Sequence, residues 1–137
     1  MPRNLASEIS EHDQLVLMMA RYYKKLGYSQ ISADIPGWNQ PSSIYWTNAP
    51  NRKYIPDLTC IDTNGNLIIL EAETCSSLND DHTRKQFEIF RAHATNKGGR
   101  FEIVVPKLCS GYKTRTLISD NVNKWGIELD NIWTPGS

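Results

Sequence analysis

The apolar pattern is densest between residues 54 and 74, where two apolar runs of strand length are joined by a short polar turn. Both runs carry apolar residues on both faces, which is typical of central strands that helices cover above and below. The turn, residues 62–66, contains Gly65, and glycine readily takes the left-handed conformation that hairpin loops require. This stretch therefore predicts a β-hairpin at the centre of a sheet.

The length of the hairpin loop decides where its carboxylates lie. With a three-residue loop at 63–65, Asp57 faces Glu71 across the two strands and Ile55 faces Glu73. Directly opposed residues share one face of the sheet, with Cβ atoms roughly 5 Å apart, and strand alternation places Glu73 on that face too. The three acids then lie together at one end of one face.

A two-residue loop at Asn64-Gly65 gives the opposite arrangement. It pairs Asp57 with Ala72 and sends both glutamates to the other face, because a one-residue slip reverses every side chain. Loop-length statistics alone favour this shorter turn. We favour the longer loop, and the two registers are distinguished below.

The remaining periodicity predicts helices and strands on both sides of the hairpin. Apolar residues spaced by three and four predict a first helix from Asn4 to Leu26, which Asn4 or Ser7 caps and Gly27 ends. The fold predicted is α/β in three layers, one domain over residues 1–137 with a mixed central sheet between helices, in the order αβββαβαβ. The other expected elements are strands at Tyr28–Asp34 and Ile44–Thr47, a helix at Asp81–Asn96, a strand at Phe101–Pro106, a helix within Ser110–Trp125 and an edge strand over Gly126–Leu129.

Composition narrows the class of protein. The chain has 137 residues and no net formal charge, and this length allows one core without disulfides. Zero net charge counts modestly against nucleic-acid binding, because such domains are often strongly basic. No apolar run is long enough to span a bilayer, and residues 1–10 lack the apolar core of a signal peptide. Three cysteines without a CxxC pair predict reduced thiols in a cytoplasmic protein.

Three carboxylates on an otherwise apolar face need a counter-charge. Like charges opposed across two strands destabilise the pair by up to about 1 kcal/mol, and burial without a partner costs more. A hard divalent cation removes the conflict, and Mg²⁺ takes one or two carboxylates together with waters and phosphate oxygens. Asp57, Glu71 and Glu73 are therefore candidates for a metal site. The alternative is a solvated hairpin end with three unrelated acids.

Pro56-Asp57, followed after the strand and turn by Glu71-Ala72-Glu73, resembles the PD-(D/E)XK nuclease superfamily. The resemblance implies a restriction-endonuclease-like fold and cleavage of phosphodiester bonds, chiefly in DNA, with Mg²⁺ or Mn²⁺ and often by a homodimer. It implies that Asp57 and Glu71 bind the metal, with the Ala72 carbonyl as a further ligand. The third motif residue helps to activate or orient the attacking water. It is usually Lys, and here it is Glu73, as in some restriction enzymes of the superfamily.

The resemblance also points to residues outside the motif. In several branches the first helix adds an acid to the metal cluster, for which Glu8 is the first candidate and Glu11 the second. A Lys or Gln on the helix after the hairpin can replace the motif Lys, which singles out Lys85 and Gln86. All four also fit ordinary positions on the surface or edge of a helix. His12, the polar member of the first helix's apolar stripe, is interpreted as a hydrogen-bonded residue at the core edge.

Basic residues provide candidate contacts to nucleic acid. They are Arg52 and Lys53 in a loop, and Lys113 and Arg115 at the start of the last helix. Cations near a helix N-terminus can contact phosphate, although a solvated helix end is commoner. Aromatic side chains near the first pair could add a surface on which bases stack; these are Trp38, Tyr45 and Trp46.

Two classes of function follow from these residues. The first is a metal-dependent nuclease. The second is a catalytically inactive nuclease-like module that binds nucleic acid or a partner protein, because Glu73 leaves the motif without its usual cation.

Overall fold

The structure is a computed structural model that describes residues 10–136. Its helices begin and end at residues suited to those positions. The Ser10 side chain accepts the N–H of Asp13 at the start of the first helix, and Asp80 accepts the N–H of His82 at the start of the second. Gly126, in the left-handed conformation, ends the third. The helical elements are α1 (Glu11–Lys25), the 3-10 turn η2 (Cys75–Ser77), α2 (Asp81–Asn96) and α3 (Thr114–Trp125).

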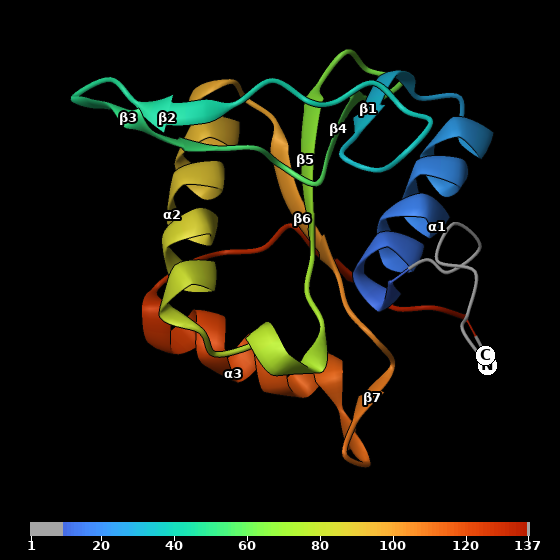
Figure 1. Cartoon of the computed structure of the whole chain (residues 1–137), viewed down its shortest axis with the longest axis vertical. Coiled ribbons are helices and arrows are strands. Elements are labelled where there is room, and N and C mark those ends of the chain that lie inside the picture. Colours follow the sequence, from blue (N-terminus) through green and yellow to red (C-terminus); the bar gives the residue numbers. More distant parts are fainter. Residues whose placement is uncertain (1–9, 137) are drawn as a thin grey trace, which may run out of the picture.

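A five-stranded mixed sheet forms the middle layer (Figure 1). Its order is β1-β4-β5-β6-β9; β4 runs antiparallel to both β1 and β5, whereas β5, β6 and β9 are parallel. With the helices, these strands follow the chain in the predicted order αβββαβαβ, so the α/β fold class is confirmed. The strands are β1 (Ser29–Ala33), β4 (Leu58–Ile61), β5 (Leu67–Ala72), β6 (Arg100–Val104) and β9 (Asn131–Trp133).

The register of the central hairpin is the one given by the longer loop. Ile61 pairs with Leu67, and the N–H of Asp62 donates to the carbonyl of Asn66 at 2.9 Å. Gly65 has a φ of +84°, which glycine adopts without strain. The two-residue turn is therefore excluded, and with it the register that separates the acids.

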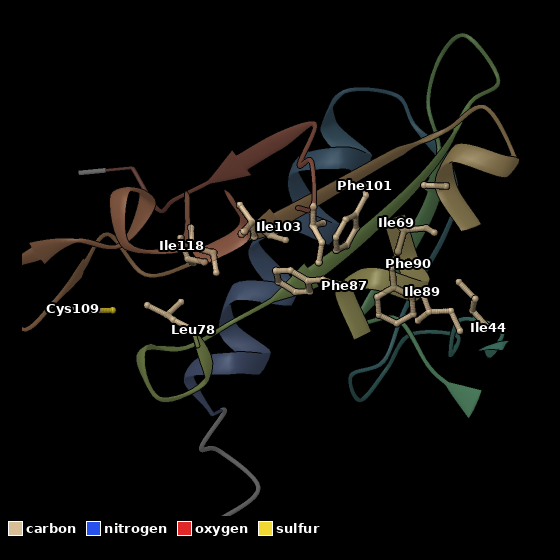
Figure 2. Close-up of a cluster of buried hydrophobic side chains, with 14 residues drawn as sticks. Ile44, Ile69, Leu78, Phe87, Ile89, Phe90, Phe101, Ile103, Cys109 and Ile118 are labelled. Carbon is tan, nitrogen blue, oxygen red and sulfur yellow. The ribbon is translucent and has the colours of Figure 1, made fainter. Parts of the chain in front are cut away.

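Helices cover both faces of the sheet. On one face, α1 packs on β1, β4 and β5 through residues such as Val16, Met19 and Leu70. On the other face, α2 and α3 pack on β5 and β6, and Phe87, Phe90 and other apolar side chains fill the space between them (Figure 2). The two apolar clusters are the two cores that the double-sided hairpin predicted. In the described part of the chain, no helix has the length and apolar character needed to cross a bilayer.

A buried polar network joins four of these elements. Glu102 in β6 is 3% exposed and accepts hydrogen bonds from Tyr23 of α1 at 2.6 Å and from the indole of Trp133 in β9 at 2.8 Å. Arg100 bonds to the other oxygen of Glu102 and to Asp62 in the hairpin turn. Each charge is paired, as burial requires, so the network fixes the turn relative to α1 and β9.

Some predicted elements were placed wrongly. Helix α1 begins at Glu11 with Ser10 as its cap, later than the predicted start, and the proposed caps Asn4 and Ser7 lie outside the described residues. The last strand comes after residues 126–129, at β9. Two small hairpins lie outside the five-stranded sheet, and of their strands only the first, expected at Ile44–Thr47, was predicted. They are β2 (Ile44–Trp46) with β3 (Ala49–Tyr54), and β7 (Leu108–Cys109) with β8 (Tyr112–Lys113).

The prediction of three reduced thiols was also wrong. Cys75 and Cys109 form a disulfide that joins η2 to the β7–β8 hairpin, with Cα atoms 5.7 Å apart. The two residues are 34 positions apart, and the chain crossover that brings them together cannot be read from their spacing. Cys60 alone is a free thiol among the described residues, and it is buried in the core as expected.

Candidate functional site

Three acids meet where the central hairpin ends. Asp57 is the residue before β4, Glu71 lies in β5, and Glu73 follows the end of that strand. Because Leu58 pairs with Leu70, the same register places Asp57 beside Glu71. Glu71 and Glu73 are 2% and 5% exposed, so both carboxyl groups are nearly removed from water. The predicted acid cluster is therefore present and buried.

Backbone hydrogen bonds hold Asp57 and Glu71 in a reciprocal arrangement. The N–H of Asp57 donates to Oε2 of Glu71 at 2.7 Å, and the N–H of Ala72 donates to Oδ2 of Asp57 at 2.8 Å. Each carboxylate thus accepts a main-chain N–H from the opposite strand. This exchange fixes both carboxyl groups side by side at the point where the strand ladder stops.

Helix α1 brings His12 to the same place. Its Nε2 lies 3.1 Å from Oδ2 of Asp57, and its Nδ1 lies 3.0 Å from Oδ1 of Asp13. Both ring nitrogens therefore face carboxylates, and the protonated ring can donate a hydrogen bond to each of them. The hydrogen bond to Asp57 is the main cause that raises the pKa of His12 to about 9, although partial burial opposes it. An imidazolium thus lies beside the acids at neutral pH.

Burial dominates the protonation of Glu71. Removal from water raises its pKa well above the usual range, and the charges of Asp57 and Glu73 raise it further. The N–H of Asp57 opposes this effect because it stabilises the ionised form. Without a cation, a proton on Glu71 therefore relieves the conflict between the facing carboxylates.

Glu73 is oriented by the turn that follows β5. The Ser77 hydroxyl in η2 donates to Oε2 of Glu73 and also contacts the carbonyl of Thr74. Burial raises the pKa of Glu73 to about 7, with the Ser77 hydrogen bond opposing it and the charge of Asp57 adding to it. The Glu73 side chain is therefore fixed, and in metal-free protein its charge changes near neutral pH.

The donor set suits a hard divalent cation in its chemistry. Asp57 and Glu71 present adjacent carboxylates, and Mg²⁺ commonly takes one or two such groups and completes its shell with water and substrate oxygens. No group of three or more His, Cys, Asp or Glu side chains within residues 10–136 is arranged as a metal site. The protein's own share of such a site would thus rest on Asp57 and Glu71.

The other predicted members of the acid site have these positions. Lys85 is exposed and pairs with Asp81 one helical turn earlier, at 3.3 Å. Gln86 is half-buried on α2. Glu11 is exposed on the first turn of α1. Glu8 lies outside the described residues.

The four predicted phosphate contacts fall into two separate regions. Arg52 and Lys53 are exposed on β3, and the ammonium of Lys53 lies 5.9 Å from the centre of the Tyr45 ring. Lys113 is exposed at the start of α3, and the Arg115 guanidinium donates to the carbonyl of Ile132 in β9. The first pair remains open to a ligand, whereas Arg115 is engaged within the protein.

His12 is hydrogen-bonded and part-buried, as predicted for a residue at the core edge, but its partner was not predicted. That partner is Asp57, which lies 45 positions away in the chain. The signal was present, because a polar residue in the inward stripe of a helix must find a partner. Ser77 and Asp80, which act on Glu73 from the segment after β5, lay in a stretch predicted only as a loop.

Comparisons with known proteins add two distant structural likenesses. No protein-family model matches the chain, and no curated protein matches it. The chain is similar to a repair endonuclease from Pyrococcus abyssi, with a TM-score of 0.45 and 15% identity over 96% of this chain and 50% of that one. It is also similar to EndoMS in a complex with double-stranded DNA, with a TM-score of 0.42 and 16% identity over 95% and 48%. The chain thus spans about half the length of these solved structures.

Proposed function

We propose that this chain is a metal-dependent nuclease of the PD-(D/E)XK type that hydrolyses phosphodiester bonds in DNA. The observation that supports this proposal is the reciprocal pair formed by Asp57 and Glu71, fixed side by side by main-chain hydrogen bonds of 2.7 and 2.8 Å. Two carboxylates held together in a buried position are unfavourable unless a cation or a proton separates their charges. A divalent cation bound by this pair would relieve the conflict and would also supply the ion that the reaction uses.

In the proposed reaction, Asp57 and Glu71 would hold Mg²⁺ or Mn²⁺. The bound ion would supply polarisation of the phosphoryl oxygen and a lowered pKa for a bound water. Glu73, oriented by Ser77, would align that water through its carboxylate. His12 would keep Asp57 in position and place a positive charge next to a site that lacks the motif Lys. We also expect a homodimer, with one site for each strand of a duplex.

A second candidate is a nuclease-like module that binds nucleic acid or a partner protein without cutting. Two observations favour it. Glu73 stands where a cation usually stabilises transition-state charge, and Lys85 pairs with Asp81 instead of reaching the acids. In this case the Asp57–Glu71 pair would bind metal without catalysis.

Cleavage assays distinguish the two candidates. Supercoiled plasmid and single-stranded circles are incubated with Mg²⁺, with Mn²⁺ or with EDTA. We expect metal-dependent nicking by the wild type, loss of nicking in Asp57→Asn and Glu71→Gln, and no change in Asp120→Asn, which alters an exposed acid on α3. Nicking that survives in both site variants would show that the acid pair is not the catalytic site.

Metal binding is measured separately by thermal unfolding. A ligand that binds only the folded state raises the melting temperature, by an amount that grows with the ratio of its free concentration to its Kd. Mn²⁺ should therefore raise the melting temperature of the wild type and of Asp120→Asn, but not of Asp57→Asn. A metal-induced shift without cleavage of any substrate would favour the inactive module.

A further inference from the structure

The charges of the chain are unevenly distributed. The stretch 35–56 contains no Asp or Glu, although the chain contains 15 such residues and has no net charge. The same stretch contains two cations, Arg52 and Lys53, and a concentration of aromatic residues. These are Trp38, Tyr45, Trp46 and Tyr54. A locally basic, aromatic region on a neutral protein is a surface whose partner is anionic and has rings to stack.

Half of this stretch forms the arm, defined here as residues 44–54 of the β2–β3 hairpin. One face of the arm is anchored on α2. Ile44 is 7% exposed and lies in the apolar cluster with Ile89, where Figure 2 shows the two side chains near each other. The Tyr54 ring meets the Phe90 ring edge to face, with centroids 6.4 Å apart. The arm is thus held on the helix by its inward residues.

The other face of the arm carries Tyr45 and Lys53. Tyr45 pairs with Lys53 across the hairpin, so both point away from the Ile44–Tyr54 pair. Tyr45 is 47% exposed and Trp46 is 43% exposed. Exposed large rings on neighbouring residues form an apolar patch of the kind that marks interaction surfaces.

A groove runs between the arm and α2. It has a volume of about 560 Å³, and no carboxylate lies in its lining. Trp46 and Tyr45 form one wall, and the C-terminal half of α2 forms the other, with His93, Asn96 and Lys97 as its polar groups. Lys97 is exposed at the end of the groove. The aromatic wall suits the stacking of a base, and the cation on the other wall suits contact with the phosphate attached to that base.

We propose that the arm groove binds single-stranded nucleic acid, with a base stacked on Trp46 and a phosphate contacted by Lys97. Aromatic side chains hold single strands because every unpaired base offers a ring face. In a duplex these faces are already covered by neighbouring base pairs, so the rings gain nothing. The inference deepens the proposed nuclease function, on which its meaning rests, because it names an unpaired strand as the form of substrate.

Binding is tested with metal-free protein so that cleavage does not interfere. Fluorescence anisotropy is measured with a labelled oligo-dT of about 12 nucleotides, within the range that one single-strand-binding fold covers, and with a duplex of the same length. We expect the wild type to bind the single strand more tightly than the duplex. Trp46→Ala should weaken single-strand binding by about 5- to 100-fold, since one stacked base contributes on that scale. Trp46→Phe, which keeps a ring, should recover most of the loss.

Matched variants separate stacking from general effects. Tyr112→Ala removes a ring that is 69% exposed on the β7–β8 hairpin, outside the arm, and should leave binding unchanged. Lys97→Gln should weaken binding and reduce the salt slope by about 0.7, the value for one phosphate contact on a single strand. Equal affinity for single strand and duplex, or equal losses in Trp46→Ala and Tyr112→Ala, would overturn the inference.

The same variants keep this inference apart from the nuclease proposal. Asp57→Asn should bind the single strand as the wild type does, because the acid site and the arm groove have no residue in common. If Asp57→Asn abolishes cleavage while Trp46→Ala changes no single-strand affinity, the nuclease proposal stands and the groove assignment fails. If Trp46 and Lys97 control binding while no variant or metal supports cleavage, the groove assignment stands and the nuclease proposal fails.

Discussion

The most informative perturbation of the acid site is Glu73→Gln, studied in EDTA. Burial raises the pKa of Glu73 from 4.5 to about 7. Its side chain is 5% exposed, so little screening by solvent reduces this effect. Glutamine has nearly the shape of a protonated glutamate and cannot ionise. The variant therefore removes the electrostatic penalty while it preserves the packing around Ser77.

The sign and size of the effect follow from linkage. Below pH 4.5 the carboxyl is protonated in both the folded and the unfolded chain, so no penalty exists. As the pH rises, the unfolded chain loses its proton first, and the free energy of unfolding falls until the folded carboxyl ionises near pH 7. Each unit of pKa difference is worth about 1.4 kcal/mol. The wild type should thus lose about 3 kcal/mol through Glu73 between pH 4.5 and about 7.5.

Urea unfolding across this pH range measures the difference directly. We expect Glu73→Gln to match the wild type at pH 4.5 and to be more stable by about 3 kcal/mol at pH 8. The matched control is Glu128→Gln, which alters an exposed glutamate outside the site and should follow the wild type at every pH. If Glu73→Gln is no more stable than the wild type at pH 8, the carboxyl is not destabilised by burial and the reasoning is wrong.

Three further predictions concern other parts of the fold. His12→Ala should lower the cleavage rate by about 10- to 100-fold, as for other residues that hold a metal ligand in place. His12→Gln keeps a side-chain donor and should retain more activity. Equal cleavage rates for the two variants would contradict a positioning role. Gly99→Ala should destabilise the protein by about 1–3 kcal/mol in urea unfolding, because the added Cβ would lie 2.3 Å from a backbone oxygen of β5. The control is Gly136→Ala, which adds its Cβ in open space and should leave the free energy of unfolding unchanged. A double change of Cys75 and Cys109 to Ser should lower the free energy of unfolding by about 3–4 kcal/mol, because the unfolded chain is no longer constrained by the cross-link. If the wild type has the same stability under reducing and oxidising conditions, the disulfide does not form in solution.

Local patterns determined much of this protein. The apolar runs on each side of Gly65 specified the hairpin, because strand alternation and loop geometry act over a few residues and leave only two registers to choose between. The same holds for α2, whose boundaries follow from its apolar stripe and from Asp80 as its cap. The acid pair Asp57–Glu71 is a direct consequence of the hairpin, so its position needed no knowledge of the rest of the chain.

Contacts between distant segments were decided only by the tertiary structure. His12 contacts Asp57, Cys75 forms a disulfide with Cys109, and Arg100 pairs with Asp62 in the hairpin turn. These contacts form because the helices cross the sheet in a particular direction and over a particular length. The sequence around each of these residues does not specify that crossover. The second strand of the arm, β3, was missed for the same reason, since the short strands of the arm are stabilised by packing on α2 more than by their own pattern. Periodicity therefore specifies which face a residue occupies, and only the assembled layers specify which side chain it meets there.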